Sequence, residues 1–264
     1  MDMNLLTLAF RDPRLEQEFL SEYEQQYRQT SRYALLAGIL LYALFGILDA
    51  YLYPGQHLTL WLIRFGIALP VLLLAAIYLF RRGPHRYTQE VLALSTLLGA
   101  LGIVVMTVII PVWTRNTYFA GLIIVVMFVY TFLRLRFIWA TLSSWLAVLV
   151  FELVSIELSD IDVINLVADN FFYLSANFVG MAACYSMEYD ARRNFTLLRE
   201  LHSERSRISQ VNVQLESLNE MLDQLAHHDD LTGLPNRRSF FAHLNQEWNR
   251  HRRFRAPMSL VLID

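Results

Sequence analysis

Long apolar runs separated by short polar segments constrain this chain more than any other feature. A helix needs about 20 apolar residues to cross the hydrocarbon core of a bilayer, and six runs approach that length. Hydrophobic residues make up 55% of the chain and charged residues 17%, against about 45–50% and 25% in an average soluble domain. We therefore predict a membrane protein. The six predicted spans are Tyr33–Tyr53, Leu60–Phe80, Val91–Pro111, Tyr118–Leu133, Phe137–Ile156 and Val163–Met187.

The arginines beside these runs predict the orientation of the spans. Nine arginines flank the runs on one side of the membrane, and only Arg115 flanks them on the other. Cytoplasmic loops carry the excess of basic residues in membrane proteins. We therefore expect a multi-pass protein of the bacterial inner membrane with both termini in the cytoplasm. The nine residues are Arg28, Arg32, Arg81, Arg82, Arg86, Arg134, Arg136, Arg192 and Arg193.

Residues 1–32 are mostly polar and are predicted to form a cytoplasmic helix. Asp12 suits the N-cap of this helix, and Pro13 suits its first position, where a missing N–H costs nothing. Glu16 falls in the first turn, where the helix dipole favours an acid. We interpret the segment as an extension of the first span. The alternative is a separate device that lies on the membrane surface.

Residues 188–227 are polar, contain neither glycine nor proline, and carry an apolar repeat. Apolar residues recur in alternating steps of three and four, which is the heptad pattern of a coiled coil. A change of heptad phase near Arg205 would alter the supercoil locally. We predict a parallel homodimer that transmits a rotation or a change of register, with a lone amphipathic helix as the alternative. The repeat, here called the seam, is Ile208, Val211, Leu215, Leu218, Leu222 and Leu225.

A dense motif follows the predicted coiled coil. Residues 228–240 have the sequence HDDLTGLPNRRSF. This segment resembles the opening of the GGDEF-domain family of diguanylate cyclases, which begins D-x-L-T-G-L-x-N-R-R-x-F. The matching positions are Asp229, Leu231, Thr232, Gly233, Leu234, Asn236, Arg237, Arg238 and Phe240.

The residues themselves predict a break in the helix and then the start of an α/β unit. Gly233 and Pro235 interrupt the long helix, and a new amphipathic helix starts at Pro235 or Asn236. The apolar run 258–263 is expected to form a buried strand that ends at Asp264. An acid at the end of such a strand is where α/β domains place catalytic groups.

We expect Asp229, Arg237 and Arg238 to be structural. A carboxylate beside two guanidinium groups can form charge-assisted hydrogen bonds that fix the turn. The resemblance implies that this segment conveys the state of the linker to the catalytic domain.

The resemblance also implies a metal site and an activity. Asp264 would help to hold the Mg²⁺ that bridges the phosphates of GTP, since Mg²⁺ takes carboxylate and phosphate oxygens. The alternative is that Asp264 only ends a strand. Two facing GGDEF domains of a homodimer would convert two GTP into cyclic di-GMP. Because the resemblance covers only residues 228–264, we expect this chain by itself to be inactive.

Ionisable residues inside predicted spans are costly and often functional. Asp49, near the outer end of the first span, and Arg64, near the outer start of the second, lie at similar depth, so we predict that they pair. Glu152, Asp169 and Asn170 belong to the fifth and sixth spans and also lie towards the outer side. These five residues are the candidate lining of a pocket for an unknown small-molecule or lipid ligand. The alternative is a packing clasp with juxtamembrane acids. Asn177, Trp61, Trp113 and Tyr118 complete the candidate lining.

Several functions fit this pattern. The first is a receptor enzyme in which an outer or intramembrane signal shifts the dimer and controls cyclic di-GMP synthesis. The second is a receptor or scaffold with a degenerate GGDEF domain, or a protein with an additional EAL phosphodiesterase domain. A transporter is disfavoured, because no span shows paired broken helices or repeats. The net charge of −2 argues against nucleic acid as a partner.

The predicted fold is an all-α membrane protein followed by the start of an α/β domain. Its parts are a cytoplasmic helix (1–32), a six-span sensor domain (33–187), a coiled-coil linker (188–227) and a truncated GGDEF domain (228–264). The spans also resemble the six-span anchors of some bacterial nucleotide cyclases, including class III adenylate cyclases. That resemblance rests on Phe10–Pro13, Leu41–Asp49 and Ile63–Phe65.

Overall fold

A computed structural model describes residues 3–81, 87–110, 116–158, 163–229 and 231–261. The chain divides into two compact units, residues 1–196 and 197–264, which are described separately. Both units are helical, and the described residues contain no β-strand.

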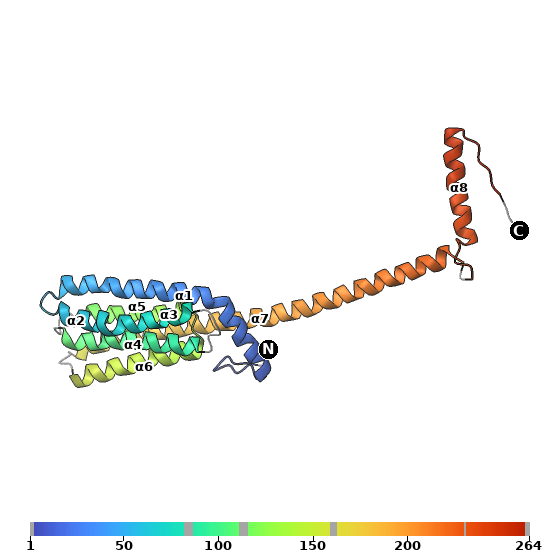
Figure 1. The fold of residues 1–264 in the computed structure, drawn as a ribbon. Helices are drawn as coiled ribbons and strands as arrows, with labels where there is room; N and C mark the ends of the chain where they lie inside the picture. Colours follow the sequence, from blue (N-terminus) through green and yellow to red (C-terminus); the bar gives the residue numbers. More distant parts are fainter. Residues whose placement is uncertain (1–2, 82–86, 111–115, 159–162, 230, 262–264) are drawn as a thin grey trace. The chain divides into compact units, whose positions relative to one another are not determined.

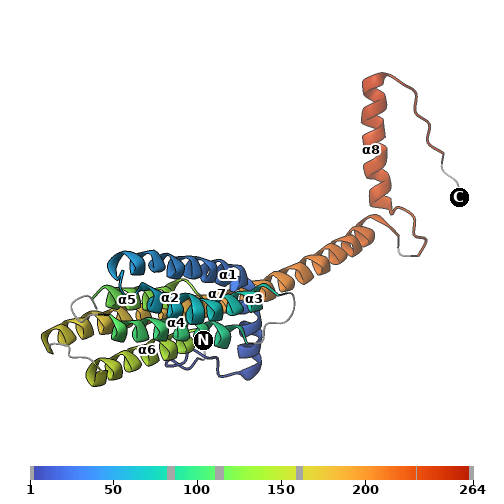
Figure 2. The same ribbon diagram turned by 60° about the vertical axis from the view of Figure 1, so that its left-hand side comes forward.

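The first unit is a bundle of helices. Its elements lie side by side in two views of the ribbon (Figures 1 and 2). The π-helical turn η1 continues α2 directly into α3, so these three elements form one apolar segment. The elements are α1 (Pro13–Leu52), α2 (His57–Ile63), η1 (Arg64–Ala68), α3 (Leu69–Phe80), α4 (Thr88–Ile109), α5 (Asn116–Thr131), α6 (Phe137–Leu158) and the first part of α7 (Val163–His227).

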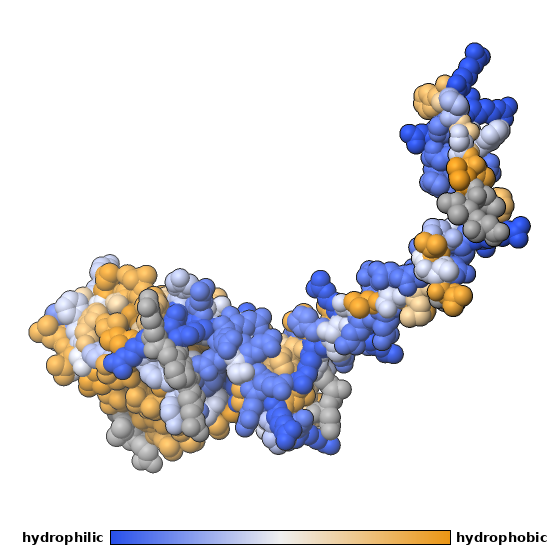
Figure 3. All heavy atoms as spheres, turned by 45° about the vertical axis from the view of Figure 1, so that its right-hand side comes forward, coloured by the Kyte–Doolittle hydropathy of each residue, from blue (hydrophilic) through white to orange (hydrophobic). Residues whose placement is uncertain are grey.

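Four helical segments in the described residues are long and apolar enough to cross a membrane. They correspond to the predicted first, second, third and fifth spans, although the first and third predicted spans extend one and two residues beyond the helices. The predicted fourth span corresponds to a shorter apolar helix, and the predicted sixth span lies at the start of α7, so a total of six stays a prediction. Hydrophobic residues gather over the surface of the bundle (Figure 3). The four segments are Pro13–Leu52, His57–Phe80, Thr88–Ile109 and Phe137–Ile156.

Helix α1 joins the polar N-terminal segment to the first span without a break. Asp12 is its N-cap and accepts a hydrogen bond from the backbone N–H of Arg14, and Pro13 is the first helical residue. Both features confirm the predicted start of the helix. They also support its interpretation as an extension of the first span.

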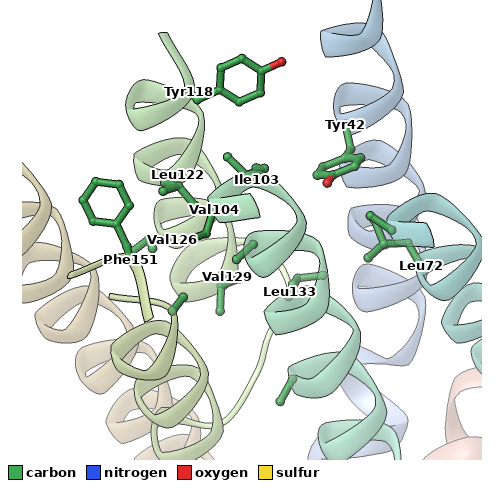
Figure 4. Close-up of a cluster of buried hydrophobic side chains, with 14 of the residues drawn as sticks. Tyr42, Leu72, Ile103, Val104, Tyr118, Leu122, Val126, Val129, Leu133 and Phe151 are labelled. Atoms are coloured by element: carbon green, nitrogen blue, oxygen red, sulfur yellow. The ribbon is translucent and has the colours of Figure 1, made fainter. Parts of the chain in front are cut away.

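Close packing around α4 holds the bundle together. Helix α4 contacts α3, α5 and α6, and buried side chains such as Val104, Leu122 and Phe151 fill the space between them (Figure 4). Because lipid is as apolar as these side chains, helices in a membrane associate by close packing, often at small residues. Gly180 illustrates this rule, since a Cβ atom there would overlap the ring of Tyr130.

A second apolar cluster secures the N-terminus against α7. Phe19 of α1 packs against both Phe10 and Phe195, with ring centroids 5.7 and 5.5 Å away. All three rings are buried. The segment that precedes α1 is thereby fastened to the helix that ends the first unit.

The second unit contains the rest of α7, a loop and α8 (Arg237–Phe254). Helix α7 ends at His227, and Gly233 adopts a positive φ of 66° in the loop, a conformation that favours glycine. Asn236 caps α8 by accepting a hydrogen bond from the N–H of Ser239. The predicted break and the predicted second helix are confirmed.

The predicted strand 258–263 is not formed in its described part. Residues 258–261 have no regular structure, and residues 262–264 lie outside the described residues. A strand is stabilised by hydrogen bonds to a neighbouring strand. The described residues of this unit contain no such neighbour, so the apolar run has nothing to pair with.

Candidate functional site

Asp49 and Arg64 form an ion pair inside the bundle. The Nε atom of Arg64 lies 2.6 Å from Oδ2 of Asp49, and its Nη2 atom lies 3.0 Å from Oδ1. Each residue is only 2% exposed. The predicted pairing of these two residues is therefore confirmed. Arg64 is also the first residue of η1, and π-helical turns are frequent at functional sites.

Further hydrogen bonds connect this pair to three helices. Tyr118 of α5 donates its hydroxyl hydrogen to Asp49. Arg64 donates to the carbonyl of Tyr42 at 3.1 Å, and the hydroxyl of Tyr42 donates to the carbonyl of Gly99 in α4 at 3.1 Å. A buried ion pair is tolerated only with good geometry and additional hydrogen bonds. This network meets that requirement and ties α1 and η1 to α4 and α5.

The other predicted pocket residues lie elsewhere. Asn170 of α7 donates to Oε2 of Glu152 in α6 at 3.1 Å, and Asp169 is half-buried beside them. The contacts found in the described residues do not join this group to Asp49 and Arg64. Their role in a sensor pocket stays a prediction.

The remaining described candidates have different partners. Asn177 is fully buried and accepts a hydrogen bond from the hydroxyl of Tyr130. Trp61 donates to the carbonyl of Gly46 at 2.8 Å. Trp113 lies outside the described residues. Among the three described candidates, Tyr118 is the one that donates a hydrogen bond to the ion pair.

A cavity lies beside the ion pair, between α1, α4 and α5. It contains about 840 Å³ of space free of protein atoms, counting its open side. Asp49, Arg64 and Tyr118 line it, whereas Glu152, Asp169 and Asn170 do not. Ligand sites are mostly apolar with a few polar groups. The cavity has these properties.

A second ionic cluster, which was not predicted from the sequence, lies at the opposite end of the bundle. Arg192 of α7 lies 2.7 Å from Glu16 of α1 and 2.8 Å from Glu188. Arg136, in the α5–α6 connection, lies 3.2 Å from Glu16. Arg192 is completely buried. Glu188 and Arg192, four residues apart on one helix, were the only local signal of this cluster, since such pairs face each other.

Aromatic rings and a backbone group complete this cluster. The guanidinium of Arg192 lies 4.1 Å from the ring centre of Phe19 and 5.1 Å from that of Phe10. Burial would raise the pKa of Glu16, but hydrogen bonds from Arg192 and the Phe10 N–H, and the charges of Arg192 and Arg136, hold it below its ordinary value. Glu16 therefore remains ionised and joins α1 to α7.

The GGDEF-like opening has an internal hydrogen-bond network. Oδ1 of Asp229 accepts from the hydroxyl of Thr232 at 2.8 Å, from its N–H at 3.0 Å and from the N–H of Leu231 at 3.2 Å. These bonds, that of the Thr232 side chain first, lower the pKa of Asp229. Among the described residues, the expected contact of Asp229 with Arg237 and Arg238 is not found. Local N–H groups are nearer to the carboxylate than side chains of the next helix, and they satisfy it first.

The predicted metal site lies outside the described part of the chain. Asp264 is not described, and the described residues contain no group of three His, Cys, Asp or Glu side chains that could hold a metal ion. Mg²⁺ binding by Asp264 therefore stays a prediction.

Comparisons with known families agree with this arrangement. The apolar bundle is that of a multi-pass, membrane-associated protein. Residues 226–264 match the GGDEF domain of diguanylate cyclases, of which they are a short part, and residues 47–202 match MASE8. Because the MASE8 match covers more than half of the chain, the chain belongs to the MASE8 family. No curated protein matches it. The similarity to adenylate cyclase anchors stays a prediction.

Replacing Asp49 with leucine should destabilise the bundle, because the charge of Arg64 would stay buried without its partner. Removing one member of a buried ion pair costs about 3–5 kcal/mol. The double variant Asp49→Leu, Arg64→Leu should be more stable than Asp49→Leu, since no charge is left unpaired. Thermal unfolding in detergent micelles measures both. A double variant no more stable than the single one would contradict the energetic importance of the pair.

The pH dependence of stability should report on Glu16. Its pKa is lower in the folded protein than its ordinary value of 4.5, so its stabilising effect is present above pH 4.5 and is lost as the pH falls through the folded pKa. Glu16→Gln should lower the unfolding temperature at pH 7, and this difference from the wild type should shrink on acidification. Glu22→Gln, at an exposed position of α1, serves as the control. A difference that is constant with pH would exclude the proposed ionisation.

Proposed function

We propose that this chain is the sensor and linker region of a membrane-bound diguanylate cyclase. The order of the two family matches supports this proposal. The single helix α7 (Val163–His227) contains the end of the MASE8 match and the start of the GGDEF match. A helix that belongs to both segments offers a direct route for a signal between them.

The seam supports a dimer as the working form. Ile208, Leu215 and Leu218 are 59%, 55% and 52% exposed in the single chain. Apolar residues on one stripe of a polar helix are stabilised when a partner helix covers them. We infer that this partner is the same stretch of a second copy, because cyclic di-GMP is made from two GTP and two GGDEF domains must face each other.

The proposed mechanism has three steps. An outer or intramembrane signal changes the packing of the bundle, α7 passes the change to the seam, and the two GGDEF domains join two GTP into cyclic di-GMP with release of two pyrophosphates. In this proposal Mg²⁺, held in part by Asp264, would neutralise charge on the GTP phosphates. The inner membrane and the cytoplasmic termini belong to the proposal, since GTP is cytoplasmic.

Disulfide formation should test the dimer. In a Cys184→Ala background, which removes the one native cysteine, Leu218→Cys should form a disulfide-linked dimer on mild oxidation. Glu220→Cys, on the opposite side of the helix, should not. A disulfide requires Cα atoms within about 7 Å, which only a seam position of a parallel pair provides. The readout is non-reducing electrophoresis. Equal cross-linking at both positions, or none at Leu218→Cys, would exclude the predicted seam.

Cyclic di-GMP synthesis should test the activity. The protein with its complete GGDEF domain, given GTP and Mg²⁺, should make cyclic di-GMP, and Asp264→Ala should abolish synthesis because a metal ligand is lost. Asp223→Ala, on the exposed surface of α7, should retain it. Product is measured by liquid chromatography and mass spectrometry. A folded dimer that makes no product would favour a degenerate sensor or a phosphodiesterase.

A further inference from the structure

The cavity beside Asp49 and Arg64 is long and apolar. Its lining in α1 extends from Leu35 to Tyr53 and in α5 from Tyr118 to Leu133. At about 1.5 Å per residue, the α1 stretch is about 27 Å long. An elongated apolar space of this kind suits a flexible chain better than a compact polar molecule.

Polar groups of the cavity gather at one end. Tyr118 and the ion pair lie there, and the charges of Asp49 and Arg64 neutralise each other. Midway along the cavity, Tyr42 and Thr96 already donate their hydroxyl hydrogens to the carbonyls of Gly99 and Leu92. Figure 4 shows Tyr118, Tyr42 and Ile103 around this region, on three different helices. A ligand would therefore meet apolar contacts along its length and a neutral polar group at one end.

The shape of the cavity argues against a second copy of the chain as its occupant. A Cβ atom at Gly38 of α1 would lie 3.0 Å from the ring of Phe128 in α5, so the two helices are in contact there. A helix is about 10 Å wide with its side chains and does not fit through such a contact. An acyl chain is thin enough to reach Gly99 and Ile103 behind it.

We propose that this cavity binds the acyl chain of an uncharged, single-chain amphiphile, with a hydroxyl-bearing head group beside Tyr118 and Asp49. In the predicted orientation this end faces the outer leaflet, so the ligand enters from the lipid. A charged head group is disfavoured, because the ion pair has no net charge to offer it. The role of this ligand as the signal rests on the proposed function, but its binding does not.

Gly121 provides a selective way to fill the cavity. It lines the cavity, and a Cβ atom built there has no atom within 4 Å. Gly121→Leu should therefore occupy the space without collision. Gly66→Leu is the matched control, because a Cβ atom at that exposed position of η1 meets only Leu62, at 3.9 Å, and Gly66 does not line the cavity.

The experiment uses a monoacylglycerol with a photoreactive diazirine in its acyl chain. The full chain in lipid nanodiscs is irradiated with this probe, and labelled peptides are identified by mass spectrometry. We expect labels in residues 35–53 and 118–133. Gly121→Leu should reduce labelling about tenfold, which is the effect expected when about two methylene groups of the acyl chain are no longer buried. Gly66→Leu should leave labelling unchanged. A fatty acid probe of the same length, which is anionic, should label more weakly.

Three results would overturn the proposal. They are equal labelling of wild type and Gly121→Leu, labels confined to other helices, and cross-links between two copies through the cavity residues. The readout needs no cyclase activity. If cyclic di-GMP is made but the cavity is not labelled, only the proposed binding site is refuted. If the cavity is labelled but no cyclic di-GMP is made, only the proposed function is refuted.

Discussion

The ion pair between Asp49 and Arg64 is the interaction on which the arrangement of the bundle depends. Charges in the apolar part of a membrane protein must be paired or reach water, and both of these residues are almost fully buried. The end of α1 must therefore meet η1, and Tyr118 brings α5 to the same point. The walls of the cavity are set by this one junction. A ligand that binds in the cavity would therefore lie against this buried ion pair.

The cluster of Glu16, Arg136, Glu188 and Arg192 has the corresponding role at the other end. It brings together the start of α1, the α5–α6 connection and α7. Phe10 and Phe19 shield the buried guanidinium from water, which strengthens its interactions with the carboxylates. The rotation of α7 within the first unit is thus fixed by charged groups from two other segments, α1 and the α5–α6 connection. Small movements of those segments act on α7 through few contacts.

Sequence patterns identified the features that depend on neighbouring residues. The cap at Asp12 and the break at Gly233 follow from side-chain size and hydrogen-bonding capacity, and both were predicted correctly. The pairing of Asp49 with Arg64 was predictable because a short connection places them at equal depth. Features that depend on how helices are rotated were not predictable. The position of Glu152 or Asn170 along its span gives the depth of the residue in the membrane but not the residue that it faces. The apolar run 258–263 predicts a strand, but it does not show whether a neighbouring strand is present.

The two polar junctions and the cavity between α1 and α5 share the same elements. Glu16 belongs to α1, and Arg136 lies in the connection between α5 and α6. If an acyl chain bound in the cavity moved α1 relative to α5, both residues would shift relative to Arg192, and the state that binds the ligand better would be favoured. Binding of the ligand would then be coupled to α7 through a contiguous set of contacts that starts at the cavity wall. The apolar core around α4 would not need a large rearrangement. This coupling is a physical one only if the cluster has two arrangements of similar free energy. Its buried and fully paired Arg192 provides a reason for such discrete states, because an intermediate position would leave a charge without a partner.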